Sequence, residues 1–172
     1  MHGDVCDTLT GMHIVDLLYL IFITLALCAA YFILLKFLPR FFAQEITRSR
    51  RNFLFPLLFI LIFSAVAYAV SYALPDPEIG NRVLHISGGF AGFLTCFFAT
   101  RDSGVRINKF QFFVCSALIV LALGVANELL EFFLQEYVGI ISAATVTDTW
   151  LDLASNTIGI ILASMCSVPF HK

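Results

Sequence analysis

The sequence has few charged residues. Asp, Glu, Lys and Arg make up 13% of its 172 residues, whereas hydrophobic residues make up 60%. A water-soluble domain has about 25% charged and roughly 45–50% apolar residues, so this composition excludes an ordinary soluble domain. The formal net charge of −2 gives no reason to expect a nucleic-acid partner, because proteins that bind nucleic acids usually carry a strong basic excess.

Two further features are missing. None of the five cysteines forms a Cys-x-x-Cys pair, and four of them lie inside apolar runs, where cysteine behaves as a small hydrophobic residue. The residues before the first apolar run include aspartates but no Lys or Arg, and the run is too long for the hydrophobic region of a signal peptide. We therefore expect this run to be kept as the first helix of the protein.

Long apolar runs are what the sequence does contain. A helix needs about 20 apolar residues to cross the hydrocarbon core of a bilayer. The runs of about this length are Ile14–Leu38, Asn52–Leu74, Arg82–Thr100, Phe110–Gln135 and Thr147–Pro169. They predict an all-α fold, a polytopic membrane helix bundle of about five transmembrane helices.

Prolines mark two of the boundaries between the runs. Pro39 is expected to end the first helix, and Pro75 with Pro77 is expected to end the second, because proline lacks an amide donor and disfavours helix in the residue before it. The chain shows no internal repeat, no low-complexity tract and no second domain. Residues 1–172 are therefore predicted to form a single membrane domain.

The basic residues alternate between the connections. The first connection contains Arg48–Arg51 and the third contains Arg101–Lys109, whereas the N-terminus and the fourth connection contain no basic residue. Short loops rich in Lys and Arg stay on the cytoplasmic side of a membrane. This pattern predicts a multi-pass protein of the cell membrane, in contact with membrane lipids, with the N-terminus outside and the C-terminus inside.

Ionisable residues interrupt the apolar pattern in the fourth run. A charged side chain at the centre of a membrane helix costs about 2.5–3.5 kcal/mol, so chains keep such residues mainly for function. Glu128, Glu131 and Gln135 are three and four residues apart, which places them on one helix face. Two carboxylates one turn apart repel each other unless a cation lies between them.

The third and fifth runs carry polar residues at a similar depth. Asp148, Asp152 and Asn156 recur at every fourth residue of the fifth run, and Arg82 and His85 lie three residues apart in the third. With the predicted topology and a rise of 1.5 Å per residue, they all lie within about 10–12 Å of the outer edge of the membrane. Three helices are therefore expected to contribute to one polar layer, which is either a structural network or a binding or catalytic site.

Single members of this layer have simpler interpretations. Asp148 or Thr147 would serve as the N-cap of the fifth helix, where a side-chain oxygen accepts a bond from the first turn. His85 would be a hydrogen-bonded packing residue, and Asn156 would link two helices. The carboxylates of the fourth run are harder to explain in this way.

Three segments resemble a known family. His85–Phe90 (His-Ile-Ser-Gly-Gly-Phe), Asn127–Phe132 (Asn-Glu-Leu-Leu-Glu-Phe) and Thr147–Gly159 are similar to the pattern of VanZ-like small membrane proteins and of the neighbouring YjdF-like group. The resemblance covers about residues 82–164. The paired Glu and paired Asp residues look more like the YjdF-like version, whereas Asn156-Thr-x-Gly159 looks more like VanZ.

The resemblance implies a cell-envelope factor, since VanZ is associated with resistance to the glycopeptide teicoplanin, but it implies no reaction. On this first hypothesis, a carboxylate-rich pocket near the outer face binds a lipid or glycopeptide-like headgroup. The residues expected to bind it, beside the carboxylates, are Arg82, Gln135, Asp148 and Asn156.

A second hypothesis is a divalent-metal-dependent enzyme that acts on a phosphorylated lipid. Carboxylate oxygens suit Mg²⁺, Mn²⁺ or Ca²⁺, and the ligands it predicts are Glu128, Glu131, Asp148 and Asp152. His85 would then act as acid or base. The catalytic residues expected on this hypothesis are Glu128, Glu131, Asp152 and His85. The sequence offers no glycine-rich or arginine-rich cradle for a phosphate, which weighs against this hypothesis.

A third hypothesis, a transporter or proton relay, is disfavoured because the inner halves of the last three runs carry almost no polar residues.

Gly88 and Gly92 lie four residues apart, and small residues at this spacing let two membrane helices approach closely. They are therefore candidates for a contact in a homo-oligomer.

Overall fold

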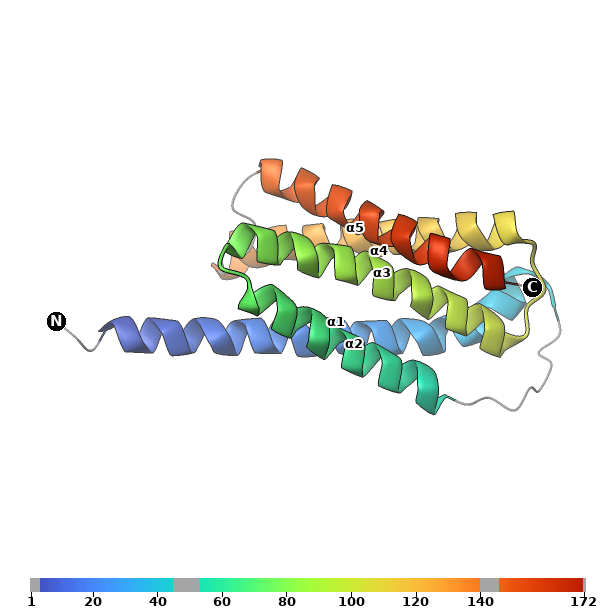
Figure 1. Ribbon diagram of the computed structural model, residues 1–172, viewed down its shortest axis with the longest axis horizontal. Helices are drawn as coiled ribbons and strands as arrows, with labels where there is room; N and C mark the ends of the chain where they lie inside the picture. Colours follow the sequence, from blue (N-terminus) through green and yellow to red (C-terminus); the bar gives the residue numbers. More distant parts are fainter. Residues whose placement is uncertain (1–3, 45–52, 140–145, 172) are drawn as a thin grey trace.

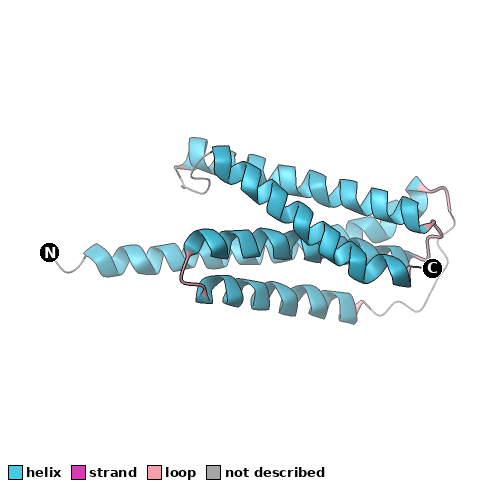
Figure 2. Cartoon of the chain, turned by 45° about the horizontal axis from the view of Figure 1, so that its top comes forward, coloured by secondary structure: helices cyan, strands magenta, loops and turns pink. Residues whose placement is uncertain are grey.

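The computed structural model describes residues 4–44, 53–139 and 146–171, and this part of the chain is helical without a strand (Figures 1 and 2). The elements are α1 (Asp4–Phe41), α2 (Leu54–Ala73), α3 (Pro77–Ser103), α4 (Lys109–Phe133), a π-helical turn η1 (Leu134–Val138), α5 (Val146–Ser167) and a 3₁₀ turn η2 (Val168–Phe170). Five of these helices are long and apolar enough to cross a membrane, which confirms the predicted all-α membrane fold.

Short polar residues fix the helix ends. Asp76 caps α3, since its side chain accepts a hydrogen bond of 2.9 Å from a backbone N–H of the first turn, and Pro77 occupies the position where no amide donor is needed. Gly104 ends α3 in the left-handed conformation, with φ of 71°. Asn108 and Gln111 form a capping box at the start of α4. The chain thus turns sharply between α3 and α4.

The prediction that Pro39 ends the first helix is wrong. Pro39 lies inside α1, which continues to Phe41. A proline so near the C-terminal end of a helix costs one hydrogen bond, and the carbonyl oxygen of Pro39 still accepts a bond of 2.8 Å from the amide of Gln44. The helix instead ends where Ala43 adopts a positive φ of 50°. The predicted cytoplasmic residues Arg48–Arg51 lie outside the described residues.

The helices pack around α3, which contacts each of the other four. Helices α1 and α2 lie on one side of α3 and helices α4 and α5 on the other (Figure 1). At a rise of 1.5 Å per residue, the 38 residues of α1 extend over about 57 Å, and its N-terminal part projects beyond the bundle. The orientation of the termini across a membrane stays a prediction.

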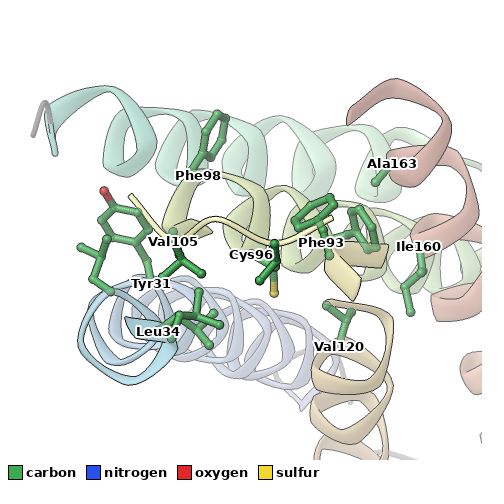
Figure 3. Close-up of a cluster of buried hydrophobic side chains, with 14 of the residues drawn as sticks. Tyr31, Leu34, Phe93, Cys96, Phe98, Val105, Val120, Ile160 and Ala163 are labelled. Carbon is green, nitrogen blue, oxygen red and sulfur yellow. The ribbon is translucent and has the colours of Figure 1, made fainter. Parts of the chain in front are cut away.

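A cluster of buried apolar side chains holds the bundle together (Figure 3). Phe93 of α3 and Phe112 of α4 are fully buried and pack edge to face, with ring centroids 5.5 Å apart. Tyr31 of α1 is also fully buried, and its hydroxyl donates a hydrogen bond of 2.8 Å to Asp102 at the end of α3. The outer surface, in contrast, exposes many large apolar side chains, as a lipid-facing surface does.

Candidate functional site

The polar residues of three helices meet at one end of the bundle. The first turns of α3 and α5 and the last turns of α4 lie together at this end (Figure 1). The residues that the structure brings together are Arg82, His85, Glu128, Asp148, Asp152 and Asn156. We call this set the polar cluster. Each of its members was among the predicted site residues.

Arg82 joins α3 to α5. Its guanidinium forms ion pairs with the carboxylates of Asp148 and Asp152, and one of its nitrogens also donates to the backbone oxygen of Asp148 at 3.2 Å. Asp152 is almost fully buried, whereas the side chains of Arg82 and Asp148 are 20% and 18% exposed. The ion pair between Arg82 and Asp148 therefore forms the accessible edge of the polar cluster.

His85 lies between the buried carboxylates of Asp152 and Glu128. Its Nε2 is 3.3 Å from Oδ1 of Asp152, and its Nδ1 is 3.8 Å from Oε1 of Glu128. The side-chain amide nitrogen of Asn156 lies 3.3 Å from Nδ1. Because that amide nitrogen can only donate, Nδ1 accepts this bond, and Nε2 carries the proton that points at Asp152.

Glu128 differs from the other carboxylates. Both of its oxygens are buried, and neither accepts a hydrogen bond from the described residues. Glu131, one turn further along α4, accepts a hydrogen bond of 2.7 Å from Asn127. A buried carboxylate without hydrogen bonds is costly, so the environment of Glu128 suits a cation or a proton.

Two glycines allow the close approach of α3 and α5 on which this geometry depends. A Cβ atom at Gly89 would lie 2.1 Å from the backbone oxygen of Asn156, and one at Gly159 would lie 2.0 Å from that of Ile86. No side chain other than hydrogen fits at either position. Gly124 of α4 lies beside the Asn156 side chain, where a Cβ would be 3.2 Å from its nitrogen.

Three details differ from the sequence predictions. Gln135 is exposed in the π-helical turn and lies outside the polar cluster, because the i to i+5 bonding of that turn departs from the i+4 register assumed for α4. Asp148 and Thr147 are not N-caps, because α5 begins at Val146 and both lie in its first turn. Asn81 was missed, although it lies four residues before His85 on the same helix face, and it donates a hydrogen bond of 3.1 Å to the buried carboxylate of α5.

The predicted metal ligands also divide into two groups. Among the described residues, the donor atoms of His85, Glu128 and Asp152 lie within 4.8 Å of one another. Asp148, which pairs with Arg82, and Glu131, which accepts a hydrogen bond from Asn127 of its own helix, do not belong to this group.

The predicted pocket lined by carboxylates stays a prediction. Two hollows lie between α1 and α2, one of them extending to α3, and no member of the polar cluster lines either. Their walls are mostly apolar.

The predicted oligomer contact through Gly88 and Gly92 stays a prediction. In the single chain, Gly92 packs against Val120 of α4, and Gly88 packs against Asn156 of α5.

A family model described as "Predicted membrane protein (DUF2238)" matches residues 10–172 of the chain. The match includes all five helices that are able to span a membrane and every member of the polar cluster. No curated protein and no solved structure matches the chain.

Proposed function

This chain belongs to the DUF2238 family of predicted membrane proteins, and we propose that it is a VanZ-like or YjdF-like cell-envelope factor whose polar cluster binds the headgroup of a lipid or of a glycopeptide-like molecule. In this proposal the protein resides in the cell membrane. The end of the bundle that carries the polar cluster lies at the outer headgroup layer.

The observation that carries the proposal is the partly exposed ion pair of Arg82 and Asp148 above a buried carboxylate layer. A headgroup phosphate or carboxylate would replace Asp148 beside the guanidinium, which binds such anions through two parallel hydrogen bonds. A headgroup ammonium would find the released carboxylate within reach. The edge of the polar cluster is thus suited to a ligand that carries both charges.

Aromatic side chains support the position of this edge at the membrane surface. Trp150, in the second position after Asp148, is 68% exposed, and Tyr137 in the π-helical turn is 72% exposed. Tryptophan and tyrosine are enriched where the hydrocarbon core meets the headgroups, because their rings are apolar and their N–H and O–H groups remain hydrated.

Trp150 also provides the test, because it is the only tryptophan of the chain. We would titrate the protein in nanodiscs with short-chain phosphatidylethanolamine or phosphatidylglycerol and record tryptophan fluorescence. The proposal predicts a saturable change that is lost in Arg82→Gln and kept in Glu136→Gln, a change at an exposed carboxylate of the same end. The absence of a saturable change with every lipid, or an unchanged response in Arg82→Gln, would refute it.

A second candidate function is a divalent-metal-dependent enzyme that acts on a phosphorylated lipid. The grouping of His85, Glu128 and Asp152 favours it. Arg82 would hold the lipid phosphate, and a bound cation would share its charge. Turnover of a phosphorylated lipid by the purified protein, dependent on a divalent cation and lost in His85→Gln, would distinguish this candidate from binding alone.

A further inference from the structure

We propose that His85, Glu128 and Asp152 form a binding site for a divalent transition-metal cation, Mn²⁺ or Zn²⁺, one layer below the ion pair of Arg82. This inference deepens the proposed function and rests on it for one point only, the role of the cation in holding an anionic headgroup. The cation site itself follows from the geometry of three side chains.

The three donor atoms lie near enough to one another to converge on one cation. One donor atom from each of the three residues lies within 4.8 Å of the others. Ligands at about 2.0–2.2 Å from a tetrahedral metal ion lie about 3.3–3.6 Å from one another. Binding would therefore draw the three donor atoms together by up to roughly 1.5 Å.

Glu128 is the independent observation that points to a ligand. The residue is 7% exposed, and neither carboxylate oxygen accepts a hydrogen bond from the described residues. One oxygen faces Nδ1 of His85 at 3.8 Å, a distance too long for a hydrogen bond. The two groups face each other across a gap, and a cation bound there to both would replace the Asn156 amide as the partner of Nδ1.

The charges of the surroundings agree with a divalent cation. Arg82 is the only cationic side chain that pairs with the carboxylates at this end of the described bundle, and it is already bonded to both Asp148 and Asp152. It leaves Glu128 without a counter-charge. Two charges from a cation would compensate Glu128 and part of the charge of its buried neighbours Asp152 and Glu131.

The identity of the donors selects the kind of cation. Imidazole nitrogen suits transition metals, whereas carboxylate oxygen suits Mg²⁺, Ca²⁺ and Mn²⁺. One imidazole and two carboxylates favour Mn²⁺ or Zn²⁺ over the Mg²⁺ and Ca²⁺ that an all-carboxylate set would bind. Three protein ligands leave at least one position of the cation open, as in sites where a substrate oxygen binds.

The second-layer contacts resemble those that orient metal ligands. Asn81 and Arg82 both donate to Asp152. Such partners fix the carboxylate in place before the cation arrives. The open position of the cation would face the headgroup held by Arg82, so that one phosphate would contact both positive charges.

The experiment measures metal binding directly. The full chain is purified in detergent, stripped with EDTA, and titrated with Mn²⁺ while the signal of free Mn²⁺ is followed by electron paramagnetic resonance; Zn²⁺ is then used in competition. We expect one Mn²⁺ per chain and a melting temperature that rises by about 5–10 °C at saturation. Glu128→Gln, which keeps the shape of the side chain, should weaken binding at least about 100-fold, and Glu136→Gln should not.

His85→Gln provides a second variant if Glu128→Gln does not yield folded protein. Absence of Mn²⁺ and Zn²⁺ binding by the wild-type chain, or equal binding by wild type and both variants, would overturn the cation site. The lipid titration monitored at Trp150 is independent of this result. Metal binding with no lipid response would retain the cation site and refute headgroup binding. A lipid response with no metal binding would retain headgroup binding and refute the cation site.

Discussion

Replacing Gly89 by alanine tests the helix contact on which the polar cluster depends. The added Cβ would lie 2.1 Å from the backbone oxygen of Asn156, whereas ordinary contacts begin at 3.4 Å. Since a backbone atom cannot rotate away, α3 and α5 would have to separate locally by about 1.3 Å, the difference between the two distances. The bond of 3.3 Å between His85 and Asp152 spans the same interface and would lengthen beyond hydrogen-bonding distance.

The neighbouring residue supplies a matched control. A Cβ at Gly88 would lie 3.7 Å from the side-chain oxygen of Asn156, an ordinary contact. Both substitutions gain the same helix propensity, about 1 kcal/mol per Gly→Ala, so the difference between them isolates the steric cost. Overpacking of this kind costs about 1–3 kcal/mol, and more where backbone must move. Gly89→Ala should therefore melt roughly 2–12 °C below Gly88→Ala in a chain of this length.

Thermal unfolding in detergent, followed by circular dichroism, measures this difference. Gly88→Ala is expected to melt at or slightly above the wild-type temperature. Gly159→Ala, whose Cβ would lie 2.0 Å from the backbone oxygen of Ile86, should behave like Gly89→Ala. If Gly89→Ala and Gly88→Ala melted at the same temperature, α3 and α5 would not pack as described, and the geometry of the polar cluster would have to be abandoned.

Three further predictions concern other contacts. Arg82→Ala would leave Asp152 buried without its cationic partner and should lower the unfolding free energy by about 3–5 kcal/mol. Thermal unfolding measures this loss, which should be smaller in Arg82→Lys. An unchanged stability would show that the ion pair is not buried. Tyr31→Phe would remove the donor to a buried carboxylate and should cost about 1.5–3 kcal/mol in the same assay, and a neutral effect would contradict that bond. In a cysteine-free background, an impermeant thiol reagent added to intact cells should label Glu78→Cys but not Arg106→Cys, and the opposite pattern would reverse the predicted orientation.

The number and kind of helices could be predicted because length and hydropathy decide whether a segment crosses a membrane. The five predicted runs correspond to five described helices, with ends that differ by several residues. The largest difference is the start of α1, at Asp4 and not near Ile14, since polar residues beyond the membrane continue a helix that apolar counting cannot detect. The prediction for Pro39 failed because a proline ends a helix only if the residues after it are also non-helical. Here the residues up to Phe41 keep helical geometry.

The polar cluster was predicted from spacing, and its hydrogen bonds were not. Periodicity places residues on a helix face, but it does not give the rotation of one helix against another. Glu128 lies 3.8 Å from His85, whereas Glu131, on the same face of α4, accepts a hydrogen bond from Asn127. Asn81 could have been found by extending the i, i+4 search from His85 towards the N-terminus. The close contact at Gly89 and Gly159 depends on the tertiary arrangement, which a single sequence does not fix.

The central position of α3 has a consequence for how the protein enters a membrane. Helices α3 and α5 are the least apolar of the five spans, and they carry the residues that bond across the polar cluster. A helix that carries an uncompensated charge moves unfavourably from the insertion machinery into lipid by itself, because the charge would be buried in hydrocarbon. Because α5 is synthesised after α3, Arg82 has no partner until the last helix emerges. We therefore expect α3 to be retained at the insertion machinery until α5 arrives, so that changes at Asp152 would reduce the yield of inserted protein before they affect any ligand.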